Sequence, residues 1–188
     1  MTGERNDFDM APVPIPVRSL REIILGAQDN LTNVLATVLG VAIGTGSTET
    51  VALAGLASGV AEAISMGGVL YTSTKAERDL FRLRARTETA SRSAWVPLKD
   101  PLQAGMVTLA AALVAAAIPL APFAVLPVGW ASVTAIVLSV GTLFALGAWK
   151  ARVTGRPWWR DAVQFVFVGG LAAVAAALIG AALRGQPA

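Results

Sequence analysis

Five stretches of about 20 mainly apolar residues follow one another along the chain, and they constrain the fold more than any other feature. A helix needs about 20 such residues to cross the hydrocarbon core of a bilayer. The stretches cover roughly residues 21–44, 49–73, 102–120, 128–149 and 162–183. With 55% hydrophobic and 14% charged residues, the mean hydropathy of +0.63 is too high for a water-soluble domain of this size. The sequence therefore predicts an all-α integral membrane protein with five transmembrane helices.

The rest of the chain divides simply around these spans. Residues 19–184 form a single predicted transmembrane domain, between a flexible, Pro-rich lead of residues 1–18 and a short tail of residues 185–188. Ser19 and Glu22 have the spacing of a capping box at the start of the first span. The second span is expected to continue as a helix into the cytoplasm to about residue 92, where its basic residues would lie near anionic lipid.

The basic residues predict the orientation. Fourteen of the fifteen Lys and Arg residues lie before the first span, between the second and third, or between the fourth and fifth; the exception is Arg184. By the positive-inside rule the N-terminus is cytoplasmic and the C-terminus external. Orientation therefore explains the net charge of +3 better than nucleic-acid binding does, and no nucleic-acid partner is expected.

The first span carries a stripe of polar and small residues. Spacings of three and four residues place them on one helical face. Polar side chains within a membrane need a partner or water, and small ones permit close helix approach. The stripe fits either ordinary hydrogen bonding to a neighbouring helix or a helix that lines a path or pairs with its own copy, leaving Leu35 and Val38 to face lipid. Its members, here called the polar stripe, are Glu22, Gly26, Asp29, Asn33, Thr37, Gly40 and Gly44.

The second span adds a carboxylate at mid-membrane depth. Glu62 lies one helical turn before Met66, so both side chains share a face. An ionisable residue at this depth is costly and is a functional candidate by default. The chain has no His and no Cys. A carboxylate beside a thioether suits a divalent ion of intermediate hardness, such as Fe²⁺ or Mn²⁺, better than Zn²⁺ or copper.

Two segments carry a resemblance to a known family. REIILGAQDNLTNVLATVLGVA and VALAGLASGVAEAISMGGVLYTSTKAERD resemble the first two helices of the vacuolar iron transporter family, whose typical patterns include R-D/E-x-I-x-G-x-x-D-G-L and S-M-G/A-x-x-x-Y-x-S. The resemblance covers about residues 18–184. It implies five helices, a homodimer, and export of cytosolic Fe²⁺ or Mn²⁺ in exchange for protons along a pathway between the subunits. Asp29 matches the family's first-helix aspartate and Met66 its second-helix methionine.

The sequence departs from the family pattern at several positions. Asn30 stands at the glycine after the aspartate, and Ser58 stands where an acid is common. The long Glu-rich cytoplasmic domain of many members is replaced by a short basic stretch, so this is a short form. The predicted metal and proton pathway comprises Asp29, Glu62, Met66 and Asn33, with secondary roles for Glu22, Thr37, Ser58 and Glu77. Gly26, Gly40 and Gly44 are predicted to form the dimer interface.

Two alternatives to metal export stay open. One is a non-transporting membrane scaffold or partner-binding protein that retains the fold; the other is a transporter of another solute. An enzyme is not expected, because no nucleophile–base pair or cofactor loop occurs. No permanently bound cofactor is expected, only transported Fe²⁺ or Mn²⁺. The expected partners are a second copy of the chain, the lipid bilayer, metal ions and protons, and the expected location is a bacterial inner (plasma) membrane.

Overall fold

The computed structural model describes residues 19–87 and 99–184, without the side chains of 84–87, and within these ranges the chain is helical. The helices are α2 (Leu20–Thr45), α3 (Thr48–Thr87), α4 (Pro101–Leu120), α5 (Val128–Thr154) and α6 (Trp158–Leu183), with a 3₁₀ turn η1 (Ala121–Ala124) after α4. The predicted lead, the tail and the end of the second helix near residue 92 lie outside the described residues.

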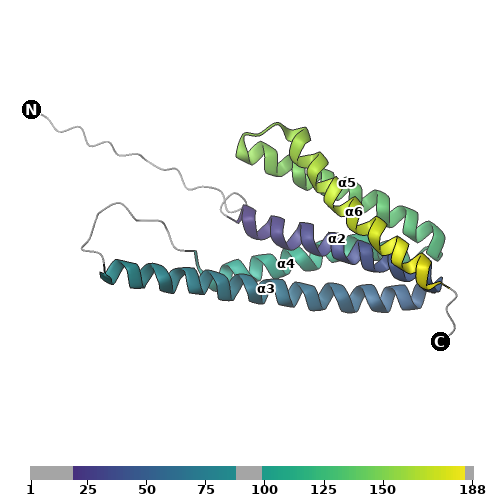
Figure 1. Ribbon diagram of the computed structural model, residues 1–188, viewed down its shortest axis with the longest axis horizontal. Coiled ribbons are helices and arrows are strands. Elements are labelled where there is room, and N and C mark those ends of the chain that lie inside the picture. The colour runs from purple at the N-terminus through teal and green to yellow at the C-terminus, as the bar shows by residue number, and fades with distance from the viewer. Residues whose placement is uncertain (1–18, 88–98, 185–188) are drawn as a thin grey trace, which may run out of the picture.

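Helix α2 lies at the centre of the bundle. It packs against α3, α4, α5 and α6, and Figure 1 shows it between the α3–α4 pair and the α5–α6 pair. Its fully buried side chains include Leu31, Val34, Leu35 and Val38. The prediction that Leu35 and Val38 face lipid is wrong: their exposed fractions are 1% and 0%. The central helix is enclosed by the other four, so its apolar face meets protein.

The helix ends follow local chemistry at several points. Gly46 and Gly155 end α2 and α5 with φ angles of 67° and 68°, a conformation that glycine adopts without steric cost. The Asp100 carboxylate caps α4 by accepting a hydrogen bond from the Leu102 amide, with Pro101 in the first turn. The predicted capping box is wrong, because Ser19 makes no side-chain capping bond and Glu22 instead accepts a hydrogen bond from Lys99.

Four of the described helices are long and apolar enough to span a membrane, namely α3 up to Leu83, α4 with η1, α5 and α6. These correspond to four of the five predicted spans. Much of their surface is apolar and points outward, with Leu53, Val114 and Phe167 about 70% exposed, as expected for helices that face lipid. Helix α2 has 26 residues, but its polar residues lower its hydropathy, so the first predicted span, over residues 21–44, stays a prediction.

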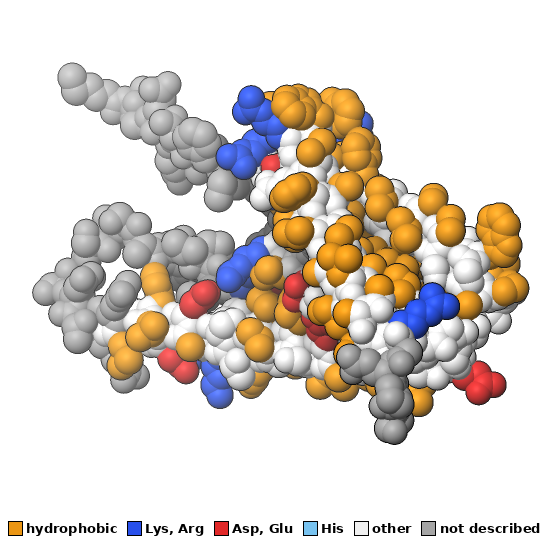
Figure 2. Space-filling view, turned by 45° about the vertical axis from the view of Figure 1, so that its right-hand side comes forward, with side chains coloured by type: hydrophobic (Ala, Val, Ile, Leu, Met, Phe, Trp, Pro, Cys, Tyr) orange, Lys and Arg blue, Asp and Glu red, His pale blue; other side chains and the backbone are white. Residues whose placement is uncertain are grey.

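Charged residues gather at one end of the bundle. Ion pairs join the start of α2 to α3 and α4, through Arg21–Glu77 and Lys99–Glu22, and the end of α5 to the start of α6. Figure 2 shows basic side chains spread over this region of the surface, whereas hydrophobic side chains cover most of the flank. The helices therefore alternate in direction between a basic end and a nearly uncharged end, as the loop charges predict.

Candidate functional site

The middle of the polar stripe of α2 is open to the outside of the single chain. Its middle residues, Asp29, Asn33 and Thr37, are exposed or half-buried, whereas Asn30 and Leu31 on the neighbouring face are fully buried. The middle part therefore faces out of the core of this chain, between α3 and α6. One helical face carries these side chains because they recur every four residues.

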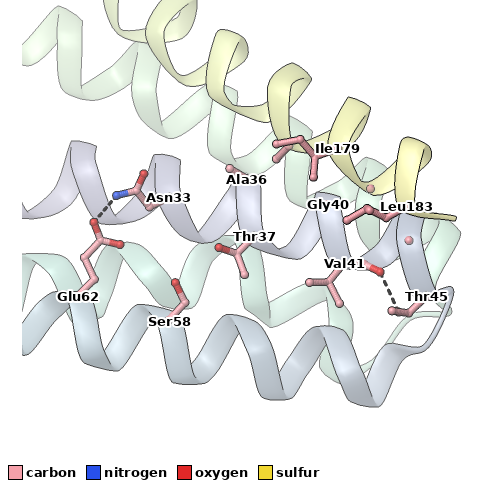
Figure 3. Close-up of a pocket in the computed structure, with 13 residues that line it drawn as sticks. Asn33, Ala36, Thr37, Gly40, Val41, Thr45, Ser58, Glu62, Ile179 and Leu183 are labelled. Carbon is pink, nitrogen blue, oxygen red and sulfur yellow. Dashed lines mark hydrogen bonds between the residues drawn. The ribbon is translucent and has the colours of Figure 1, made fainter. Parts of the chain in front are cut away.

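Asn33 and Glu62 form the centre of the site. The Asn33 side-chain amide donates a hydrogen bond to Glu62 Oε1, which joins α2 to α3 (Figure 3). Asp29, one helical turn before Asn33, lies close enough to Glu62 for their two carboxyl groups to interact. The structure thus brings together three of the four predicted pathway residues from helices that are adjacent in the bundle.

An open groove of about 730 Å³ begins at this cluster and runs toward the uncharged end of the bundle. Its polar end is formed by Asn33, Glu62, Thr37 and Ser58, as Figure 3 shows. The remaining lining is apolar or small and comes from α2 and α6. We call this the α2–α3–α6 groove; the rest of its lining comprises Ala36, Gly40, Val41, Gly44, Thr45, Ala176, Ile179, Gly180 and Leu183.

Three of the other predicted site residues, Met66, Glu77 and Glu22, lie outside the groove lining. Met66 is half-buried on α3, one turn from Glu62, and does not line the groove. Glu77 is exposed and pairs with Arg21 at 4.0 Å. Glu22 is buried and pairs with Lys99 at 2.6 Å, which ties the start of α2 to the start of α4. Ser58 lines the groove one turn before Glu62.

The three glycines predicted at a dimer interface make close contacts within the chain. A Cβ at Gly26 would collide with the Thr108 carbonyl of α4, and one at Gly40 would lie 3.0 Å from the Ala176 carbonyl of α6. Gly44 lies against Gly180. Small residues here let α2 approach α4 and α6. Their role between two copies of the chain stays a prediction.

The site of a single chain offers few ligands for a metal ion. Within residues 19–83 and 99–184 no three His, Cys, Asp or Glu side chains form a group that could hold one. Asp29 and Glu62 supply two carboxyl groups, and Asn33 an amide oxygen. Such a pair can hold a proton or contribute oxygen ligands to a divalent ion, but a complete coordination shell needs further ligands.

Asn30, a departure from the family pattern in the sequence, is a structural residue. It is fully buried, and its side-chain amide donates hydrogen bonds to the carbonyls of Gly59 on α3 and Ala112 on α4, each at 3.0 Å. One side chain thereby clamps three helices, directly beside Asp29. The sequence does contain a signal for this role. The Asn30 amide lies near Leu31 and Val34 on the apolar side of the helix, where it needs a buried hydrogen-bond partner.

Comparisons with known proteins extend over most of the chain. The sequence model of the VIT family matches residues 20–94 and 88–181. Vacuolar iron transporter 1 of Arabidopsis thaliana is 26% identical over 207 aligned residues, which cover 84% of this chain and 83% of the relative. The matched segments include all of the residues in the Asp29, Asn33 and Glu62 cluster.

Proposed function

Because the chain belongs to the VIT family, we propose that it exports a divalent transition metal, Fe²⁺ or Mn²⁺, from the cytosol in exchange for protons. The observation that carries the proposal is the Asn33–Glu62 hydrogen bond with Asp29 beside it, at the head of the α2–α3–α6 groove. A named iron transporter among the relatives supports iron as one substrate.

The donor chemistry favours these metals. The chain contains no His and no Cys, so the nitrogen and thiolate ligands that Zn²⁺ and copper prefer are missing. Carboxylate and amide oxygens remain, and the Met66 thioether is one turn away on α3. Oxygen ligands with an optional thioether suit Mn²⁺ and Fe²⁺, with the sulfur favouring the softer Fe²⁺.

Proton exchange follows from the same carboxyl groups. Each carboxyl group can carry either a proton or, as a carboxylate, a metal ion. A metal ion that binds their oxygens requires the deprotonated form and displaces the proton. Alternate occupation by metal and proton therefore provides the minimum chemistry for antiport without histidine.

A second copy of the chain would complete the ligand set. The α2–α3–α6 groove is open on one side, and Asp29 is exposed in the single chain. Two copies facing each other across a two-fold axis would double the two carboxylates, the amide and the thioether. The proposal therefore places the transport pathway at a dimer interface, lined by the middle of α2.

The test is metal flux into proteoliposomes under a pH gradient, measured separately for Fe²⁺, Mn²⁺, Co²⁺ and Zn²⁺. Asp29→Asn and Glu62→Gln should each abolish Fe²⁺ and Mn²⁺ flux, because each removes a carboxylate that would bind both the metal and the proton. Glu49→Gln is the matched control, because Glu49 is an exposed acid in the first turn of α3 that does not line the groove. Wild-type flux in the Asp29→Asn/Glu62→Gln double variant would refute the proposal and favour a scaffold.

The dimer is tested by cysteine crosslinking in native membranes, since the chain has no cysteine of its own. Thr37→Cys, in the groove, should form a disulfide with its copy. Val114→Cys, 70% exposed on α4 and outside the groove lining, is the control. Crosslinking at residue 114 but not at residue 37 would place the contact between copies elsewhere.

A further inference from the structure

The α5–α6 turn carries an unusual concentration of basic and aromatic residues. We call residues 150–161 the turn patch; its charged and aromatic members are Lys150, Arg152, Arg156, Trp158, Trp159, Arg160 and Asp161. Basic side chains lie beside hydrophobic ones at the top of Figure 2, which corresponds to the α5–α6 turn at the upper left of Figure 1. The patch is not part of the α2–α3–α6 groove.

The single acid of the patch is already compensated. The Asp161 side chain is 5% exposed and lies 3.6 Å from Lys150 Nζ and 4.0 Å from an Arg156 nitrogen. Arg152 and Arg160 are exposed and form no ion pair with any residue that the structure describes. The surface of the patch therefore carries positive charge that no acid of the described chain neutralises.

The turn holds these groups in a defined arrangement. Gly155, with φ of 68°, reverses the chain, and the Arg156 amide donates a hydrogen bond to the Ala151 carbonyl at 2.9 Å. Arg160 lies over the Trp159 ring, 5.4 Å from its centroid. Trp158 packs edge-on against Phe144 of α5, with ring centroids 6.0 Å apart.

Both tryptophans remain about half exposed despite these contacts. They lie where the apolar part of α6 begins, and Trp is enriched at this level of a bilayer because its ring is apolar and its N–H polar. A second basic cluster, on the extension of α3, differs in composition. There Glu77 and Asp79 lie among the basic residues and pair with Arg21 and Arg82.

We propose that the turn patch binds the headgroup of an anionic phospholipid, with Arg152 and Arg160 contacting the phosphate and the two tryptophans lying at the level of the glycerol backbone. Arginine donates two parallel hydrogen bonds to a phosphate oxygen pair, and a basic residue near a membrane surface adds attraction to anionic lipid. Charge complementarity and position at the end of the apolar spans favour a lipid over a soluble anion. The predicted cytoplasmic orientation of this end places the patch at the leaflet richest in anionic lipid.

The experiment measures lipid retention by the full chain in detergent, using native mass spectrometry. Phosphatidylglycerol and phosphatidylcholine are added separately, and a third arm adds inorganic phosphate as a competitor. The wild type should retain phosphatidylglycerol preferentially, and millimolar phosphate should not displace it. Arg152→Gln/Arg160→Gln should weaken phosphatidylglycerol binding on the order of 30-fold, from two lost charges.

The control variant is Lys75→Gln/Arg82→Gln on α3, which removes two positive charges from the same end of the bundle. It should leave phosphatidylglycerol retention within about twofold of wild type. Three results would overturn the proposal. They are an equal loss of phosphatidylglycerol retention in both variants, unchanged retention in Arg152→Gln/Arg160→Gln, and displacement of the lipid by phosphate. If the double variant does not fold, Trp159→Leu decides: it keeps every charge, and it should weaken retention several-fold.

Discussion

Replacing Asn30 by alanine should destabilise the bundle without touching the groove. The change removes two buried hydrogen bonds, to Gly59 and Ala112, which hold α3 and α4 against α2. Side-chain hydrogen bonds within membranes average about 0.6 kcal/mol and reach about 1.7 kcal/mol. The two bonds together therefore contribute about 1–3 kcal/mol.

Two further terms nearly cancel. Truncation leaves a small cavity in a fully buried site, which costs on the order of 1 kcal/mol or less. Against this, the side-chain oxygen Oδ1 of Asn30 has no hydrogen-bond partner among the described residues. Its removal therefore relieves a desolvation cost of similar size. The expected net loss in unfolding free energy is about 2 kcal/mol.

Asn30→Asp provides a sharper comparison, because it keeps the shape and changes only the donor. A carboxylate would then face two carbonyl oxygens at the same 3.0 Å distances, and repulsion replaces attraction. We expect a loss larger than that of alanine, on the order of 3 kcal/mol or more. We therefore predict that the free energy of unfolding falls in the order wild type, Asn30→Ala, Asn30→Asp.

The assay is reversible unfolding in mixed micelles by titration with sodium dodecyl sulfate, followed by far-ultraviolet circular dichroism. Asn33→Ala is the matched control: the side chain is exposed in the single chain, so stability should change by no more than about 0.5 kcal/mol, while metal flux falls. An Asn30→Asp variant as stable as wild type would show that the amide does not clamp the three helices.

Two shorter predictions concern the charged end and the topology. Lys99→Met should cost about 2 kcal/mol, because it leaves the Glu22 carboxylate buried and unpaired; the half-exposed Lys99 keeps this below the 3–5 kcal/mol of fully buried pairs. The double variant with Glu22→Gln should recover part of that loss in the same unfolding assay. Cysteines at Ser47 and Thr154 should react with a membrane-impermeant maleimide from opposite sides of sealed vesicles, and labelling from one side only would contradict the alternating directions of the helices.

Much of the architecture could be predicted from the sequence, because long apolar segments have few alternatives in a membrane. The helix bounds lie within a few residues of the predicted spans, and the second helix continues past residue 73 as far as Thr87. The ends at Gly46 and Gly155 reflect backbone conformations that few other residues adopt. These features depend on local chemistry and segment length alone.

The faces of the helices could not be predicted in the same way. In a soluble protein an apolar side chain indicates the core, but in a membrane both lipid and core are apolar. The sequence pattern therefore predicts a lipid-facing position for Leu35 and Val38, although both are buried. The capping box failed for a related reason: Lys99, 77 residues from Glu22, forms an ion pair that local spacing does not reveal.

The residues of the candidate site were visible in the sequence, but their pairing was not. A carboxylate or amide inside an apolar span is rare enough to identify Asp29, Asn33 and Glu62 individually. Their juxtaposition depends on the register of α3 against α2, which the turn at Gly46 and the packing of the two helices determine together. Met66 has the expected spacing from Glu62 yet lies outside the groove lining, since one helical turn along α3 carries it past the end of the groove.

The use of glycines within the chain has a consequence for the proposed dimer. Gly26, Gly40 and Gly44 already contact α4 and α6, so we expect the polar sector around Asp29 and Asn33, rather than a seam of glycines, to form the contact between copies. An exposed carboxylate within a membrane span is costly, and a second copy would cover it. Two polar helix faces that meet retain water between them, whereas helices packed closely through glycines exclude it. The proposed interface would then admit a hydrated ion along the groove while the tight helix contacts stay within each subunit.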